Sequence, residues 1–292
     1  MTPSNSAAPT PSSLVLRAIV SATMVYCAVV AVASMCVATQ PRIVSLVPSL
    51  TEDLFAIGAG AQVVGTSQFT DYPAQAAKLP QVSSATGLDV ERIVALHPDV
   101  VVGIPSQRAS TAPLQRSGVR VVIIPDDQFE DIFTDLSTLG RLTGHESQAT
   151  SLIERLRART AALVRTVRGR SRPRCFVVLG VAPIFTVGDR SYIAHLIGLA
   201  GGRNAAGDLR SAAYGRYSAE ALLHDQPDAI IADEASGINE VRSALPWNAL
   251  HAVREGRTYV LHDAAILERP GPRYNAGLAW LIERLQELRH AR

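Results

Sequence analysis

The sequence is poor in cysteine, with only Cys27, Cys36 and Cys175 in 292 residues. The first two lie in an N-terminal apolar run, so a chain processed after that run would keep one. A single thiol forms no internal disulfide, so the sequence does not predict a disulfide framework. Basic blocks are also missing, and the formal net charge is only +2. The composition therefore argues against a nucleic-acid partner.

Sequence motifs of common catalytic chemistry are missing as well. The sequence has no Gly-x-Ser-x-Gly elbow, no His-Glu-x-x-His motif and no glycine-rich phosphate loop with a lysine. Its seven histidines are scattered, and His97 and His224 fall near the ends of short predicted helices, where they suit capping. Cys175 begins a predicted buried strand. The sequence therefore predicts no catalytic residue and no metal site, and a cleft enzyme is a less favoured alternative.

The N-terminus joins a polar leader to a long uncharged run. Residues 1–13 are rich in Ser, Thr and Pro, Arg17 follows, and residues 18–40 carry no charge. This pattern predicts a secretory signal, although the run is long enough to remain as a membrane anchor. Met35 before Cys36 does not suit a lipid-attachment site. We therefore expect a leader with a signal or anchor over residues 1–40, and residues 41–292 outside the cytoplasmic membrane.

A single long amphipathic helix is predicted near the middle of the chain, over residues 146–168. It contains no proline and no internal glycine, and Gly144 and Gly169 flank it. We interpret residues 144–169 as a rigid connector between two parts of the chain, although an ordinary long helix inside one domain would show the same periodicity. Its apolar positions are spaced by threes and fours, with Thr160 filling the one gap: Ala149, Leu152, Ile153, Leu156, Leu163, Val164 and Val167.

Predicted strands alternate with predicted helices on both sides of this connector, which indicates parallel sheets. The expected fold is α/β, with two repeated βα lobes, each with a mainly parallel sheet, joined by one long rigid helix. The lobes span residues 41–143 and 170–292. In the first lobe, Ser49 and Glu52 have the spacing of a capping box for the helix over residues 50–57. In the second, residues 181–187 are expected to form a loop or a short hairpin.

The two lobes also repeat each other in sequence. Glu91-x6-Pro98-Asp99 matches Glu220-x6-Pro227-Asp228, and each match leads into an apolar strand. Residues 54–60 (LFAIGAG) resemble residues 196–202 (LIGLAGG), in the same order along the chain. Two matches in one order indicate that the lobe was duplicated.

Ligands of open parallel sheets bind outside the carboxyl ends of the strands, and two such lobes would make a cleft between them. The loops expected there contain aromatic, small and a few polar groups, which suit a large and partly apolar ligand. They lie at residues 48–49, 72–73, 85–87, 105–107, 185, 214–217 and 263–273.

The order of these elements resembles the helical-backbone periplasmic binding proteins, which serve ABC importers of cobalamin, haem and ferric siderophores. The resemblance covers residues 42–289 and is nearest to the cobalamin-binding members. The segments that carry it are residues 42–52 (RIVSLVPSLTE), 70–73 (TDYP), 91–99 (ERIVALHPD), 180–186 (GVAPIFT), 246–247 (PW), 256–259 (GRTY) and 269–273 (RPGPR). It implies an exported, periplasmic binding protein that makes or breaks no bond.

The resemblance also implies a set of ligand-binding residues. Tyr72 and Phe185 match aromatic residues that pack on the ligand from opposite lobes, and Tyr214 stands where the cobalamin binder has a tryptophan. Flat aromatic faces bury a large apolar area of a macrocycle at low entropic cost. Asp263, Arg269 and Arg273 are further candidates that precede the terminal helix. The two arginines could reach a ligand carboxylate or could anchor that helix.

Glu91 and Glu220 are predicted to dock a permease. Each lies in the first turn of a short helix, one in each lobe, at matching positions of the repeat. Acids also favour helix N-termini for local reasons. In the family that the chain resembles, however, acids at these places pair with arginines of a two-fold permease dimer.

The resulting prediction is a monomer that captures a corrinoid such as cobalamin between its lobes and passes it to an ABC permease. A haem or ferric-siderophore binder of the same family is the alternative, because two tryptophans that the resemblance implies near Ala85 and Ile104 are absent. A membrane-anchored sensor is less favoured. Contact with the membrane is expected only through the N-terminal segment or the permease.

Overall fold

The computed structural model describes residues 40–84, 87–126, 128–206 and 209–290. The predicted leader and apolar run therefore lie outside the described residues, apart from Gln40. Among the residues that are described, no helix is both long and apolar enough to cross a membrane.

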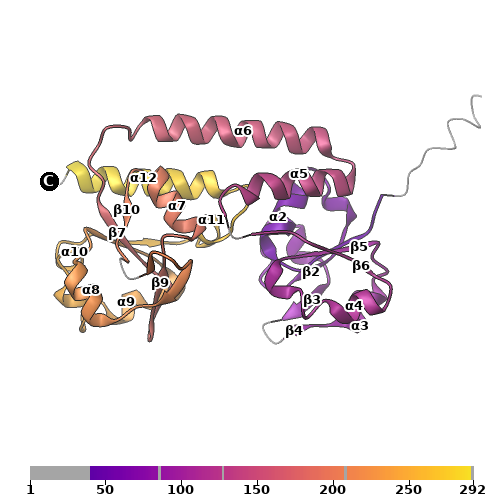
Figure 1. Ribbon diagram of the computed structural model, residues 1–292, viewed down its shortest axis with the longest axis horizontal. Helices are drawn as coiled ribbons and strands as arrows, with labels where there is room; N and C mark the ends of the chain where they lie inside the picture. Colours follow the sequence, from indigo (N-terminus) through magenta and orange to yellow (C-terminus); the bar gives the residue numbers. More distant parts are fainter. Residues whose placement is uncertain (1–39, 85–86, 127, 207–208, 291–292) are drawn as a thin grey trace, which may run out of the picture. The chain divides into compact units, whose positions relative to one another are not determined.

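The first lobe contains one six-stranded sheet (Figure 1). Its order is β4-β3-β2-β1-β5-β6, and every neighbouring pair is parallel except β3 with β4. The central strands are buried on both faces, which explains why they read as short β-branched runs. The strands are β1 (Ile43–Ser45), β2 (Val63–Ser67), β3 (Gln81–Ser84), β4 (Gly87–Leu88), β5 (Val100–Gly103) and β6 (Arg120–Ile123).

The helices of this lobe begin with α2 (Pro48–Ala56), which follows β1 directly. The predicted capping box is wrong: Val47 is the N-cap, Ser49 lies inside the helix, and no side chain caps it. Proline at the first position, where no N–H partner is needed, starts the helix instead. The remaining helices are α3 (Val90–Ala95), α4 (Ala112–Arg116) and α5 (Asp131–Thr143).

The second lobe contains two sheets. A parallel sheet has the order β10-β7-β12-β13, and a separate antiparallel sheet has the order β11-β9-β8. The expected loop or hairpin over residues 181–187 is therefore a hairpin, extended by a third strand. The strands are β7 (Arg174–Val178), β8 (Gly180–Val181), β9 (Ile184–Val187), β10 (Arg203–Asn204), β11 (Tyr214–Arg216), β12 (Ala229–Asp233) and β13 (Thr258–Leu261).

Helices cover the parallel sheet of the second lobe and end the chain. Ser191 and Ser218 cap α7 and α8 with side-chain oxygens that accept backbone N–H groups. The helices are α7 (Tyr192–Leu199), α8 (Ala219–Asp225), α9 (Ile238–Val241), α10 (His251–Arg254), α11 (Ala265–Glu268) and α12 (Tyr274–His290).

The repeat predicted from sequence is present in the backbone. The strand order β2-β1-β5-β6 of the first lobe matches β10-β7-β12-β13 of the second. Asp99 accepts a 2.7 Å hydrogen bond from the backbone N–H of Arg42, and Asp228 accepts one of 2.7 Å from that of Arg174. These bonds fix the start of β5 against the start of β1, and the start of β12 against the start of β7. The α/β fold of two βα lobes is therefore confirmed.

The second sequence match is shifted by one residue in the structure. Gly58 has φ +90° after α2, and Gly201 has φ +76° after α7. In each turn the next residue, Ala59 or Gly202, donates its N–H to the carbonyl five residues earlier. Gly58 therefore corresponds to Gly201, whereas the sequence match aligned it with Ala200.

The connector is α6 (Glu146–Arg165), which ends three residues before the predicted Arg168. It lies along α5 and α12 (Figure 1). Ala149 and Leu156 are buried at this seam. Thr160, the polar residue in the stripe, lies 2.6 Å from the Tyr274 hydroxyl and donates to Asn275 Oδ1 at 3.0 Å. Thr160, which interrupts the apolar stripe, therefore makes a polar contact between α6 and α12.

A cluster of charges joins α2 of the first lobe to the segment that precedes α12. The Glu52 side chain is 2% exposed, and its oxygens accept from Arg269 Nη1 at 3.0 Å and from Arg273 Nε at 2.7 Å. Asp71 also pairs with Arg269, and Asp263 with Arg273. We call these five residues the Glu52 cluster.

Replacing Glu52 by Gln should destabilise the protein by about 3 kcal/mol, because two partly buried guanidiniums lose the carboxylate they share. Urea unfolding at pH 7 measures this. Asp71→Asn is the matched control, since Asp71 is 67% exposed and its pair should contribute less than about 1 kcal/mol. Equal losses in the two variants would show that burial gives Glu52 no special role.

Two buried carboxyl groups face the interface of α2 and α5. Neither oxygen of Asp53 has a hydrogen-bond partner among the described residues, and Asp135 Oδ1 also has none. Burial raises the pKa of Asp53 well above its usual range, and the charges of Asp135 and Glu52 add to this. Burial, with the nearby Asp131 and Asp126, raises the pKa of Asp135 to about 8. Asp135 is therefore mostly protonated near neutral pH.

The raised pKa of Asp135 predicts a pH dependence of stability. Below pH ~4 the carboxyl is protonated in both the folded and unfolded states. As pH rises toward 8, the unfolded chain loses the proton while the folded chain keeps it, so stability falls. Asp135→Asn should flatten this fall and be more stable than the parent at pH 8. Urea unfolding between pH 5 and 8 measures it, with exposed Glu154→Gln as control; an unchanged slope would contradict the assignment.

Candidate functional site

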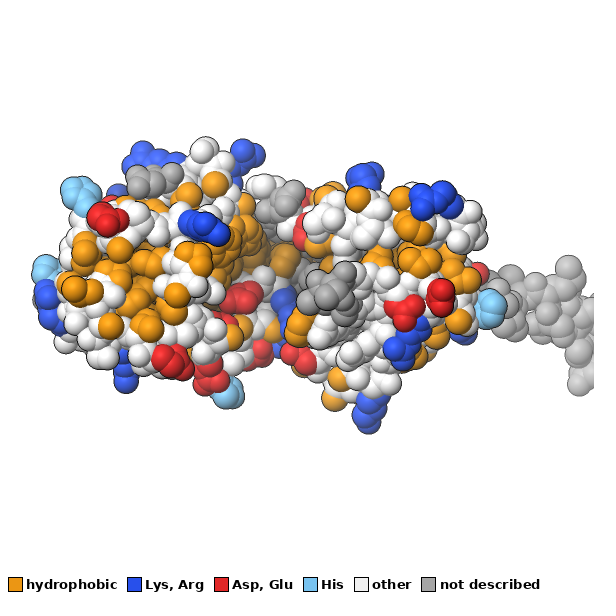
Figure 2. Space-filling view, turned by 90° about the horizontal axis from the view of Figure 1, so that it is seen from below, with side chains coloured by type: hydrophobic (Ala, Val, Ile, Leu, Met, Phe, Trp, Pro, Cys, Tyr) orange, Lys and Arg blue, Asp and Glu red, His pale blue; other side chains and the backbone are white. Residues whose placement is uncertain are grey.

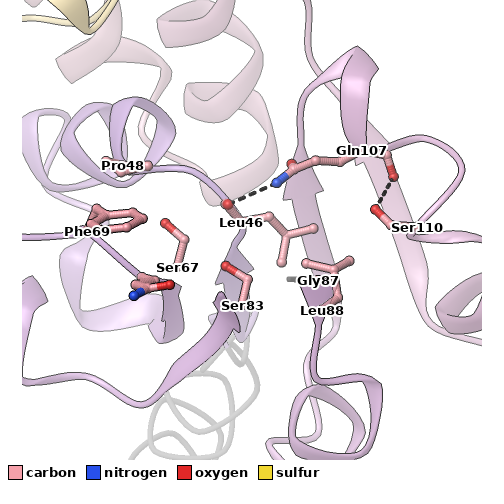
Figure 3. Close-up of a pocket in the computed structure, with 10 residues that line it drawn as sticks. Leu46, Pro48, Ser67, Phe69, Ser83, Gly87, Leu88, Gln107 and Ser110 are labelled. Atoms are coloured by element: carbon pink, nitrogen blue, oxygen red, sulfur yellow. Dashed lines mark hydrogen bonds between the residues drawn. The ribbon is translucent and has the colours of Figure 1, made fainter. Parts of the chain in front are cut away.

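A cavity of about 360 Å³ opens at the carboxyl ends of β1, β2 and β3 (Figure 3). This is the place where the topology predicts a ligand. Gln107 closes one side, because its Nε2 donates to the Leu46 carbonyl at 3.1 Å and its Oε1 accepts from the Ile104 N–H at 3.2 Å. The lining residues are Leu46, Pro48, Ser67, Gln68, Phe69, Ser83, Gly87, Leu88, Gln107 and Ser110. We call this space the Phe69 cavity.

Phe69 is the residue that the sequence reasoning missed. Its side chain is 65% exposed, and its backbone has φ +68°, a conformation that is unfavourable for a bulky side chain. The turn around it is fixed, since Ser67 Oγ lies 3.1 Å from Thr70 Oγ1 and the Phe69 carbonyl accepts from Arg269 at 3.0 Å. The only sequence signal was an aromatic residue beside the predicted loop at Tyr72.

Tyr72 lies in a different cavity. That cavity measures about 550 Å³ and runs along α2, where Phe55, Pro73 and Pro272 also line it. The Arg273 guanidinium lies over the Tyr72 ring, 4.1 Å from its centroid. The ring is about half exposed, and it connects the predicted aromatic site to the Glu52 cluster.

The second lobe presents its aromatic residues on the three-stranded sheet. Phe185 of β9 pairs with Arg216 of β11, and Tyr214 lies two residues before Arg216, so the three side chains share one face. Phe185 and Tyr214 are 39% and 45% exposed. The structure thus brings together two rings that were predicted separately, and it adds an exposed cation, Arg216, that was not predicted.

The carboxyl ends of the second parallel sheet meet the segment before α12. Val178, Asp233 and Leu261, at the ends of β7, β12 and β13, line a narrow cavity with Leu267 and Glu268. Burial, with Asp233 nearby, raises the pKa of Glu268 to about 7. The next residue, Arg269, contacts the first lobe through the Phe69 carbonyl and Glu52. Strand ends of both lobes therefore converge on residues 268–273.

The face opposite α6 is hollowed between the two lobes, and acidic side chains gather beside the hollow (Figure 2). Asp263, Arg269 and Arg273 are together in the Glu52 cluster, where each already has a partner of opposite charge. Of the two roles considered for the arginines, the observed contacts are those of an anchor. Contact of one ligand with both Tyr72 and Phe185 stays a prediction.

Glu91 and Glu220 are exposed in the first turns of α3 and α8. Neither forms an ion pair with another residue of the described ranges. Their surroundings match: Asp89 caps α3, Ser218 caps α8, and the residues that follow the helices, His97 and Gln226, have φ +46° and +41°. The two acids are therefore equivalent points of the repeat.

Metal-binding groups matter at this site because the alternative ligands include iron complexes. Within the described part of the chain, no group of three or more His, Cys, Asp or Glu side chains is placed to hold a metal ion. Cys175 is buried in β7, and burial raises the pKa of its thiol to about 12. Exposed aromatic rings and neutral polar groups thus dominate the candidate site.

The sequence and the fold are both similar to those of known proteins. The sequence is 27% identical to the vitamin B12-binding protein of Vibrio parahaemolyticus over 263 residues, which is 89% of this chain and 95% of that protein. The structure matches the periplasmic vitamin B12-binding protein of Vibrio cholerae with a TM-score of 0.76 and 25% identity, over 85% of this chain and 98% of that one.

The periplasmic haem-binding protein of Roseiflexus sp. RS-1, in its apo form, matches with the same TM-score of 0.76 and 25% identity. The match covers 85% of this chain and 99% of that one. The sequence profile of the periplasmic binding protein family matches residues 43–265, most of the described chain. The chain belongs to the periplasmic binding protein family.

Proposed function

We propose that the chain is an exported substrate-binding protein of an ABC importer, and that it captures a corrinoid between its lobes for delivery to a membrane permease. The observation that carries the proposal is the exposure of four aromatic rings, two in each lobe: Phe69, Tyr72, Phe185 and Tyr214. Exposed rings leave apolar area in water, and a bulky ring ligand would cover it. Relatives named vitamin B12-binding proteins support the corrinoid over other ligands.

A haem ligand is the second candidate, because a haem-binding protein matches the fold with the same TM-score as a vitamin B12-binding one. Tyr72 could then act as an iron ligand. Against this, its ring lies under the Arg273 guanidinium and its cavity adjoins a cluster of five charges. A corrin carries its metal with its own ring nitrogens and needs no side-chain ligand from the cavity.

Titration of the purified full-length chain in detergent tests the proposal. We expect saturable binding of cyanocobalamin at one site, with weaker binding of haem and of a ferric hydroxamate. Phe185→Ala should weaken cyanocobalamin binding about tenfold, since it removes a ring worth roughly 1.5 kcal/mol of stacking. Leu245→Ala is the matched control, because Leu245 is exposed in the same lobe outside the three-stranded sheet. Binding of haem or the hydroxamate without cyanocobalamin would overturn the proposal.

Docking to the permease is proposed to use Glu91 and Glu220. A two-fold permease offers two equivalent sites, and a monomer can match them only with two equivalent surfaces. The repeat supplies such surfaces, each with an exposed acid at a helix start that is free of ion pairs with the described residues. The expected partners are arginines of the permease.

Charge reversal separates docking from ligand capture. Glu91→Arg or Glu220→Arg should lower uptake in cells at least tenfold, while affinity for the ligand in solution stays within twofold of the parent. Glu154→Arg, on the exposed side of α6, is the control and should transport normally. Loss of ligand affinity in the Glu91 or Glu220 variants would refute a docking role.

A further inference from the structure

We infer that the Phe69 cavity is a specificity site that accepts an uncharged, carboxamide-bearing edge of the ligand and disfavours an edge that bears carboxylates. The inference rests on the proposed corrinoid function and deepens it. It concerns which chemical groups of the ligand enter the first lobe.

None of the described residues that line the cavity has an ionisable side chain. Three lining residues carry hydroxyls, two carry amides, and the others are glycine or apolar: Ser67, Ser83 and Ser110; Gln68 and Gln107; Leu46, Pro48, Phe69, Gly87 and Leu88. Ser67, Ser110 and Gln107 already form hydrogen bonds within the protein. A hydroxyl can still accept a further bond, and the Gln107 amide keeps a second N–H and a second lone pair, so this lining can match a carboxamide, which both donates and accepts. A carboxylate only accepts, and its charge would find no opposite charge in this lining.

Arg269, a cation at the rim of the cavity, is already paired with two carboxylates. Arg269 contacts the Phe69 carbonyl at the rim, but its guanidinium also binds Glu52 and Asp71. The hydrogen bond from Arg269 lowers the pKa of Asp71, so that carboxyl is ionised at neutral pH. In the Glu52 cluster as a whole, two arginines face three carboxylates, which leaves a formal charge of 2 − 3 = −1. The rim therefore repels an incoming carboxylate.

A third cavity, which adjoins the Phe69 cavity, does not change this charge balance. It shares Gln68, Ser83, Gly87 and Leu88 with the Phe69 cavity and adds one acid and one base, Asp89 and Arg92. Asp89 is engaged as the N-cap of α3, where it accepts from the Arg92 N–H at 2.9 Å. With one acid and one base, the lining of this neighbouring cavity thus adds no net positive charge.

Phe69 orients the ligand within this neutral site. Its ring lies beside Pro48 and Ser67, and Gln107 and Ser110 lie on the opposite side of the cavity (Figure 3). A ring ligand stacked on Phe69 would direct its peripheral groups toward the hydroxyls and amides of the lining. Cobalamin and cobinamide carry carboxamides around the corrin ring, whereas haem carries two carboxylates at one edge. The cavity therefore discriminates by the charge of the periphery rather than by the metal.

Two corrinoids with the same ring and cobalt test the inference: dicyanocobinamide, with carboxamide side chains, and dicyanocobyrinic acid, with carboxylates in their place. Each is titrated into the purified full-length chain by calorimetry at pH 7.5. We expect the amide to bind at least about tenfold tighter, because an unpaired carboxylate loses hydration. Ser110→Arg, which places a cation in the lining, should reduce this preference at least threefold.

Ser117→Arg is the matched control, since it adds the same charge to the same lobe at the exposed end of α4, outside the cavity. It should leave the preference unchanged, and thermal melts check that both variants fold. Equal affinity of the parent for the two corrinoids would overturn the inference and leave the proposed function standing. Binding of neither corrinoid would overturn both. An equal effect of the two Ser→Arg changes would assign the preference to the charge of the whole protein.

Discussion

The geometry of the candidate site depends on one buried carboxylate. Glu52 holds Arg269 and Arg273 at once, and these arginines also contact Phe69, Tyr72, Asp71 and Asp263. Two guanidiniums that share one carboxylate can meet it only in a narrow set of positions, because each guanidinium donates in a fixed plane. The segment before α12 is therefore fixed against α2, and the aromatic residues of the first lobe take their places from that arrangement.

The internal repeat sets the arrangement of strands and helices around the Glu52 cluster. Each lobe fixes its strands with an aspartate that accepts the N–H of an arginine at the first strand, at 2.7 Å in both cases. The matching turns after α3 and α8 then place two exposed acids at equivalent points. The lobes differ where the ligand is expected: the first adds β3 and β4, and the second adds a three-stranded sheet. The two lobes share their geometry at the proposed docking positions and differ around the proposed ligand site, as expected if both lobes contact one symmetric partner but bind different parts of the ligand.

The fold was largely predictable because its signals are local or periodic. Apolar spacing indicated α6, and short β-branched runs between glycine turns indicated the parallel strands. The capping box failed because its pattern is also local: it could not show that Glu52 has partners 217 and 221 residues away. Phe69 was missed for a similar reason, since its exposure and its φ of +68° result from packing and from a bond to Arg269. Tyr72 and Phe185 were named from a resemblance, which gives positions but not the cavity that each side chain faces.

A rigid frame limits how the site can discriminate between ligands. α6 packs along helices of both lobes, and the Glu52 cluster adds a second connection, so wide closure around a ligand would break several contacts. Selectivity must then come from groups that are already in place. The Phe69 cavity offers such groups: its lining holds neutral hydroxyls and amides, and the adjacent Glu52 cluster has excess negative charge. Together they disfavour a ligand carboxylate without any movement of the lobes. Charge at the ligand edge, more than ligand size, is therefore the property that this structure can sense.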